Sequence, residues 1–282
     1  MSSTMTYADY AALPGVRFSD LCRMATSPLH FAARADGDAQ TDTPAMAMGR
    51  AIHCAVLEPD AFARQYTRRP EEFHDGRSKA AKEWKAETEA SGRIVLGSSD
   101  WHRVERCARA VHSDPIACRY LRAGQAEQVL RWEQPDGRKC KARLDWVGTA
   151  ADGTAVVVDL KTTRTQSLRQ FAASAANYHY HAQLAWYLDG LAAEHGATAR
   201  IITVSTLAPY DVVVYRLPPD VLAHGQDLIA EWLRDLEACE QSDTWPGIAE
   251  GVERDLTLPT WAMPGDDADD LAGLNLDAEG LS

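Results

Sequence analysis

Residues 139–163, KCKARLDWVGTAADGTAVVVDLKTT, determine how the rest of the chain can be interpreted. The stretch 141–147 has apolar residues at alternate positions, and 155–160 is a Val-rich run typical of a buried strand. Ala151-Asp152-Gly153 lies between them and is typical of a turn. We therefore expect a β-hairpin.

Three charged residues lie near the ends of this hairpin: Asp145 on the first strand, and Asp159 and Lys161 on the second. Successive side chains of a strand point to opposite faces, so Asp159 and Lys161 share a face that Asp145 can also reach. An ionised Asp after a run of Val is costly to bury unless a charge compensates it, and a divalent cation is a common compensator. A structural Asp–Lys ion pair is the alternative, and these residues alone do not decide between the two.

The composition limits the class of protein. With 282 residues, 45% of them hydrophobic, the chain can bury a substantial core. No apolar run is long enough to span a membrane, and the N-terminus has no basic segment followed by an apolar one. The six cysteines include no CxxC pair, so we expect reduced thiols and no zinc or iron–sulfur site. We therefore expect a cytoplasmic protein without a membrane partner.

The net charge of −12 is unfavourable for a protein that binds phosphates. However, residues 247–282 hold nine Asp or Glu and one Arg, a balance of −8, which leaves −4 for residues 1–246. The acidic excess therefore lies mainly in the tail. The remainder can still carry a basic channel, and the carboxylates of a metal site contribute to its negative charge.

Helices are expected before the hairpin. Pro44 opens a helical run that ends before Pro59, and Gly49 and His53 lie on or beside its apolar face. A single His in such a place is more often a packed core residue than a ligand. The stretch 77–93 interleaves lysines with Trp84; a solvated helix face is favoured there over a DNA-contacting one.

Further elements surround the hairpin. A strand from about residue 126 precedes it and carries Glu127, which alone is an unremarkable surface acid. A helix from about Tyr180 to Gly196 follows it, and Tyr180, Gln183 and Tyr187 share one face of that helix. The remaining expected elements are a helix over 168–177, strands over 200–207 and 211–217, and a helix over 218–239.

The order of Asp145, a spacer of thirteen residues and Asp159-Leu160-Lys161 resembles the PD-(D/E)xK nuclease superfamily, with Leu144 in place of the usual Pro. Gly49-x3-His53 and Gln183-x3-Tyr187 resemble the GxxxH and QxxxY elements of its RecB-type branch. Taken together with Glu127, the pattern is similar to phage and prophage exonucleases of the exodeoxyribonuclease VIII (RecE) type. The likeness covers roughly Phe18 to Trp261.

The resemblance implies an α/β fold with a restriction-endonuclease-like core, in which helices flank a central mixed β-sheet and a helical region precedes it. The expected nuclease domain is 1–246, helical to about 122 and catalytic from about 123. The expected acidic arm is 247–282, extended and partly disordered.

The resemblance also implies the site. Asp145, Asp159, the Leu160 carbonyl, His53 and Glu127 would hold one or two Mg²⁺ ions, for which Mn²⁺ can substitute. Lys161 would orient the attacking water and stabilise developing charge. The residues expected to contact DNA are Gln183, Tyr187, Tyr180 and Arg143.

The implied activity is 5′ to 3′ degradation of the ends of linear double-stranded DNA by a ring of subunits, in a phage or prophage system that includes a strand-annealing protein. Three alternatives remain open. A structure-specific or restriction-type endonuclease would share these motifs. A non-catalytic DNA-binding module should have lost Asp159 or Lys161, and a hydrolase of small phosphoesters does not account for the helix motifs.

Overall fold

The computed structural model describes residues 5–33, 43–73, 76–150, 152–164, 167–191 and 196–258. The helices are α1 (Tyr7–Ala12), α2 (Phe18–Leu21), η1 (Cys22–Ala25), α3 (Pro28–Ala32), α4 (Pro44–Leu57), α5 (Pro59–Gln65), η3 (Glu71–Phe73), α6 (Lys79–Ala90), α7 (Ser98–Ser113), α8 (Pro115–Leu121), α9 (Leu168–Asn177), α10 (Tyr180–Leu191) and α11 (Pro219–Ser242). The strands are β1 (Val16–Arg17), β2 (Tyr66–Arg68), β3 (Ile94–Leu96), β4 (Gly124–Glu133), β5 (Lys139–Thr149), β6 (Ala155–Thr163), β7 (Ala197–Ser205) and β8 (Val212–Arg216).

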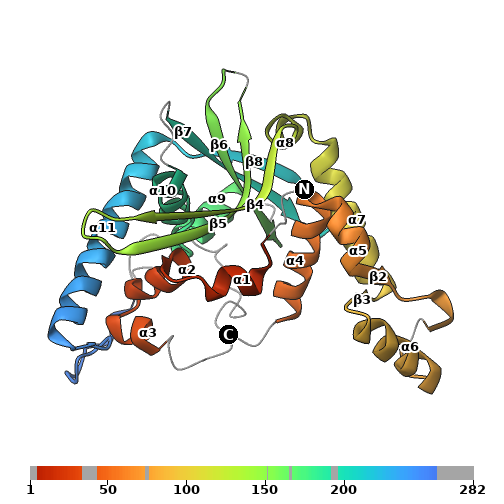
Figure 1. Ribbon diagram of the computed structural model, residues 1–282, viewed down its shortest axis with the longest axis horizontal. Coiled ribbons are helices and arrows are strands. Elements are labelled where there is room, and N and C mark those ends of the chain that lie inside the picture. The colour runs from red at the N-terminus through yellow and green to blue at the C-terminus, as the bar shows by residue number, and fades with distance from the viewer. Residues whose placement is uncertain are drawn as a thin grey trace. The chain divides into compact units, whose positions relative to one another are not determined.

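Contacts divide the chain into two units, Met1–Phe18 with Asp42–Asp227, and Ser19–Thr41 with Leu228–Ser282. The first unit contains a six-stranded mixed sheet in which β4 and β5, β5 and β6, and β7 and β8 pair antiparallel, whereas β6 and β7 pair parallel (Figure 1). Since β4 pairs with one edge of β5 along most of its length, β6 and the short parallel strand β1 must share its other edge.

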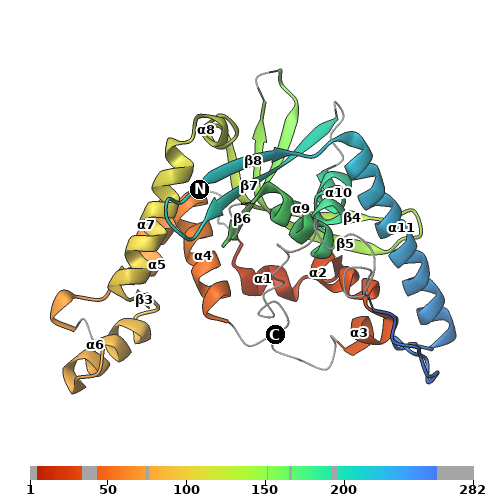
Figure 2. The ribbon, with the colours of Figure 1, turned by 180° about the vertical axis from the view of Figure 1, so that it is seen from behind.

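Helices cover both faces of this sheet. On one face α4 and α7, side by side in Figure 2, pack against β6 and β7 through Ile52, Val104, Val158 and Ile202, all in one hydrophobic core. On the other face lie α9 and α10, where Trp186 of α10 is fully buried and donates a hydrogen bond to the Lys141 carbonyl. The expected fold class, a mixed sheet flanked by helices, is confirmed.

The second unit contains η1, α3 and most of α11. Ser27 caps α3 by accepting a hydrogen bond from the His30 amide, as expected for a Ser-Pro helix start. Phe31 stacks on Trp245 with ring centroids 6.0 Å apart, and the Leu29 amide donates to the Pro246 carbonyl. These contacts tie α3 to the residues that follow α11.

The predicted domain bounds stay a prediction. In the predicted arm 247–282, residues 247–258 form neither a helix nor a strand, and the rest lies outside the described residues. None of the helices in the described ranges combines the length and apolar character that a membrane span requires.

Replacing either of two helical glycines with Ala should change the free energy of unfolding, in opposite directions. A Cβ at Gly225 of α11 would lie 2.7 Å from the His181 carbonyl oxygen of α10, whereas at Gly49 of α4 it would lie 3.5 Å from Thr162 Oγ1. We expect Gly225→Ala to lower the free energy of unfolding by about 1–3 kcal/mol, because backbone must move. We expect Gly49→Ala to change it little or raise it by up to about 1 kcal/mol. Urea denaturation of both variants checks this, and equal effects would contradict it.

Candidate active site

The site begins where β5 and β6 separate. The two strands pair from Thr149 and Ala155 as far as Trp146 and Val158, and the next pair, Asp145 with Asp159, is not formed. Beyond that point the Leu160 amide donates its hydrogen bond to the Asp145 side chain, with Oδ2 at 2.9 Å, and not to the backbone of β5. The fork between the strands therefore places both predicted carboxylates together.

These two carboxylates are poorly hydrated. The Asp159 side chain is 2% exposed and that of Asp145 is 19% exposed. Burial raises the pKa of Asp145 well above its usual range, and the charge of nearby Asp159 raises it further. A buried and a partly buried carboxylate close together require a nearby positive charge.

Lys161 supplies part of that charge. Its Nζ lies 2.9 Å from Asp159 Oδ2, donates to Gln183 Oε1 at 3.1 Å, and lies 4.5 Å from the centre of the Tyr180 ring. Burial lowers the pKa of Lys161, but Asp159 and Asp145 outweigh this, so the pKa is above its ordinary value. Lys161 is therefore a fixed cation at neutral pH.

The predicted helix motif after the lysine meets it in space. Gln183 and Tyr187 lie one turn apart on α10, and Gln183 Nε2 donates to the Tyr187 hydroxyl at 2.6 Å. Burial raises the pKa of Tyr187 well above its ordinary value, and Asp159 adds to this shift. The Tyr187 hydroxyl therefore stays protonated and can donate a hydrogen bond. Gln183 accepts the hydrogen bond from Lys161.

The predicted GxxxH histidine faces the same fork. His53 on α4 places Nδ1 3.5 Å from Asp145 Oδ2, and its side chain is 26% exposed. Burial lowers the pKa of His53, so the imidazole is neutral at pH 7 and the contact with Asp145 is not an ion pair. A neutral imidazole beside two carboxylates is able to bind a metal ion.

Glu127 lies on β4 opposite Asp145, at the one position where the β4–β5 register skips a pair within its described length. Its φ of 54° is uncommon for a residue with a side chain. Strain of this kind often occurs at functional sites. Arg143 Nε donates to Glu127 Oε2, and the Arg143 guanidinium lies 5.3 Å from the centre of the Tyr7 ring. Here Arg143, a predicted DNA contact, binds the predicted metal ligand.

The donor set fits a hard divalent cation, although within the described ranges no three His, Cys, Asp or Glu side chains already stand close enough to hold one. Lys161 and Arg143 occupy two of the carboxylates instead. Asp159 Oδ2 is buried and forms no hydrogen bond; the close Lys161 ammonium satisfies its charge but not the hydrogen-bond geometry. Its lone pairs remain available for a cation, as do the other carboxylate oxygens and the His53 imidazole.

Two neighbours of the site were not predicted. Lys141, 4% exposed, donates to the Tyr10 and Ala11 carbonyls at 3.2 and 3.0 Å and so caps α1. Tyr7 of the same helix contacts Arg143 and accepts a hydrogen bond from Arg17. No local pattern could reveal these contacts, because the Lys141–Tyr10 partners lie 131 residues apart.

Comparison with known proteins gives a matching family and similar solved structures. A family described as "PDDEXK-like domain of unknown function (DUF3799)" matches residues 17–254. No curated protein sequence matches the chain. Among solved structures, a protein from Eubacterium rectale provisionally described as an exonuclease is similar with a TM-score of 0.57 at 13% identity, covering 92% of this chain and 96% of that one. A structure described as SSO0001 gives a TM-score of 0.37 at 12% identity, covering 79% of this chain and 81% of that one.

Proposed function

Because the chain belongs to the PDDEXK-like family over residues 17–254, we propose that it is a Mg²⁺-dependent exodeoxyribonuclease. It degrades linear double-stranded DNA from 5′ to 3′ and leaves 3′ single-stranded ends. The observation that carries the proposal is the fork, where Asp145, Asp159 and Lys161 meet with His53 and Gln183. A purely structural Asp–Lys pair accounts for neither the second carboxylate nor the neutral imidazole.

The cation would be held by Asp145, Asp159 and the Leu160 carbonyl, with His53 and Glu127 as further ligands, and Mn²⁺ can replace Mg²⁺. When bound, it supplies Lewis acidity: it lowers the pKa of a water and neutralises charge on the phosphate. Glu127 would bind the cation through both of its oxygens only if Arg143 left it, and Arg143 would then be free to contact a phosphate of the substrate.

The other residues act on the water and the DNA. Lys161, held by Gln183 and the Tyr180 ring, orients the attacking water and stabilises the charge that develops on the phosphate. Tyr187 keeps the Gln183 side chain in place and, being protonated, offers a donor to the nucleotide. The Gln183–Tyr187 pair thus holds the Lys161 ammonium in a fixed position.

The direction of degradation and the assembly belong to the same proposal. The RecE-type resemblance supports a homo-oligomeric ring that encloses a DNA end and works with a single-strand annealing protein, in a phage or prophage setting. A ring also reconciles DNA binding with the net charge of −12, because only the lining of its channel must be basic.

The decisive experiment is cleavage of a linear duplex labelled at its 5′ or its 3′ end, with Mg²⁺ or EDTA, beside a closed circle of the same sequence. We expect early release of the 5′ label, an intact circle, and no reaction in EDTA. Cutting of the circle would favour an endonuclease. Absence of any cleavage by folded, Mg²⁺-supplied protein would favour a non-catalytic DNA-binding module.

A further inference from the structure

Two of the described Phe, Tyr and Trp side chains are exposed, Tyr7 at 59% and Tyr178 at 52%. The Tyr7 side chain is held by the Arg143 guanidinium and by a hydrogen bond from Arg17. In the part of the chain that the structure describes, the Tyr178 ring has one aromatic partner, Tyr180, on which it stacks with centroids 5.7 Å apart and an interplanar angle of 23°. The outer face of the Tyr178 ring is therefore open to a further flat group.

An unusual backbone turn produces this stack. Residues two apart in a continuous helix do not face each other. Tyr178 and Tyr180 can stack because α9 ends at Asn177 and α10 begins at Tyr180. Between them His179 has a φ of 53°, which is uncommon for a residue with a side chain and costs free energy. The stack therefore persists against a conformational cost, as expected of a surface that binds a ligand.

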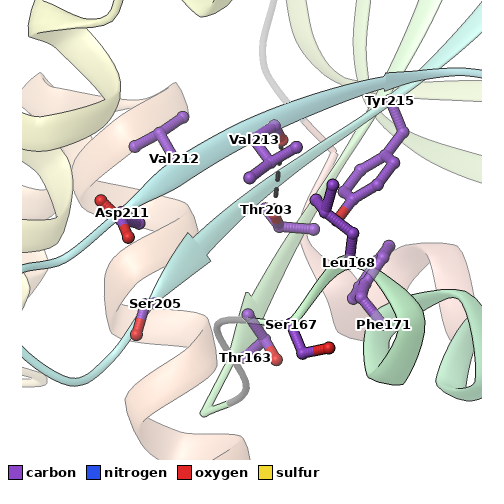
Figure 3. A pocket seen from close by; sticks show the side chains of 10 residues that line it. All are labelled: Thr163, Ser167, Leu168, Phe171, Thr203, Ser205, Asp211, Val212, Val213 and Tyr215. Carbon is purple, nitrogen blue, oxygen red and sulfur yellow. Dashed lines mark hydrogen bonds between the residues drawn. The ribbon is translucent and has the colours of Figure 1, made fainter.

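Apolar packing supports the inner end of the stack. Phe171 of α9 is 6% exposed and stacks on Tyr215 of β8 with centroids 4.7 Å apart (Figure 3). The Phe171 ring also lies 6.2 Å from the Tyr180 ring, and Lys161 Nζ lies 4.5 Å from the centre of Tyr180. The exposed ring of Tyr178 is thus separated from the Lys161 ammonium by one supported tyrosine. A nucleotide close to a phosphate at Lys161 can reach it with its base.

The proposed nuclease function creates a need for such a ring. An enzyme that degrades one strand of a duplex and leaves the other must break the terminal base pair, and the freed base loses its stacking within the duplex. The side chains of Asp159 and Lys161 are 2% and 20% exposed, so the phosphate has to enter a recessed fork. An exposed aromatic ring beside that fork can replace the lost stacking, because every base has a π-face.

We propose that Tyr178 stacks on the unpaired base of a nucleotide next to the cleaved phosphate. The inference rests on the proposed nuclease function and specifies how the same site binds its substrate. The aromatic ring makes the contact, and the hydroxyl is dispensable. Because stacking does not read the edges of a base, the contact does not depend on the DNA sequence.

The first test compares variants on one linear duplex with Mg²⁺. Tyr178→Leu removes the aromatic ring and should lower kcat/KM about tenfold by raising KM. Tyr178→Phe keeps the ring and should retain the wild-type value. The matched control is Leu168→Ala at the opposite end of α9, where the side chain is 61% exposed, and it should also retain the wild-type value.

The second test separates stacking from an indirect effect through Tyr180 and Lys161. A displaced lysine would slow the cleavage of every substrate equally. A tetrahydrofuran abasic residue is placed at each of the first four positions of the degraded strand in turn, which removes one base at a time. On the duplex that lacks the stacked base, wild type and Tyr178→Leu should have the same kcat/KM. Equal losses on the intact duplex and on all the abasic duplexes would overturn the proposal, and so would full activity of Tyr178→Leu on intact DNA.

A binding measurement distinguishes failure of this inference from failure of the proposed function. An Asp145→Asn protein is mixed with a duplex that carries 2-aminopurine at the position found with the abasic residues. The fluorescence of this base, which stacking quenches, should fall on binding and should fall less when Tyr178→Leu is added. Identical fluorescence in the two proteins would overturn the stack and leave the nuclease intact. Absence of both cleavage and binding of any duplex by folded wild type would overturn both.

Discussion

Replacing Lys161 with Met should reduce the rate of duplex DNA cleavage by about 10³-fold, because the ammonium that stabilises the developing charge is lost. The ammonium lies between Asp159 and Gln183, so the uncharged side chain cannot keep those contacts. The rate is measured as release of end label at saturating Mg²⁺. The control is Lys139→Met on the same hairpin, where the lysine is exposed, and we expect this variant to keep wild-type activity.

Lys161→Met should also destabilise the fold. Removing one partner of a buried ion pair leaves the other charge uncompensated, which typically costs about 3–5 kcal/mol, and Asp159 is 2% exposed. Adding Asp159→Asn to this variant should recover much of the stability and none of the activity. Equal stability of Lys161→Met and wild type, or substantial cleavage by the folded variant, would contradict the role given to this lysine.

The local sequence patterns predicted the catalytic hairpin and the helices around it. The alternating stretch 141–147 lies in β5 and the Val-rich run 155–160 lies in β6, and the helix expected over 168–177 is α9 with the same bounds. Pro44 and Pro59 delimit α4 as expected, because proline fits the first turn of a helix and disrupts its interior. Where a prediction rested on periodicity over ten or more residues, the structure follows it.

Local sequence patterns could not predict very short strands or strands formed by distant segments. Strands β2 and β3 contain three residues each, too few to show alternation, and β1 contains two. They exist because distant segments pair, as Val16 does with Cys140. The helix expected over about Tyr180 to Gly196 is observed as Tyr180–Leu191, and residues 192–195 lie outside the described residues.

The site shows the same division. The spacing of Asp159 and Lys161 predicted that they share one face of a strand, and the spacing of Gln183 and Tyr187 predicted that they share one side of a helix. These four residues could therefore be selected from the sequence as candidates for the site. The meeting of Asp145 with Asp159 depends on the fork between β5 and β6, and the position of Glu127 depends on its unusual backbone. Backbone of this kind follows from tertiary packing and not from local propensity.

Replacing Asp145 with Asn should abolish cleavage and yet raise stability at neutral pH in EDTA. The folded pKa of Asp145 lies above its unfolded value, mainly because of burial. Below the unfolded pKa of about 3.9 the carboxyl is protonated in both states and does not affect folding. As the pH rises toward the folded pKa, the unfolded state loses its proton first, so the free energy of unfolding falls by up to about 1.4 kcal/mol per unit of pH.

An amide at this position cannot ionise, and its oxygen can still accept from the Leu160 amide. We therefore expect Asp145→Asn to have the higher Tm at pH 7.5, by about 2–4 °C for each kcal/mol, and an unchanged Tm near pH 3.5. Thermal unfolding across this range measures the difference. Mg²⁺ should reverse the order at pH 7.5, because a cation held at 100 times its Kd stabilises wild type by about 2.7 kcal/mol and the variant has lost a ligand. A Tm gain that persists at low pH would show that it does not come from the carboxylate charge, and an equal response to Mg²⁺ would remove Asp145 from the metal site.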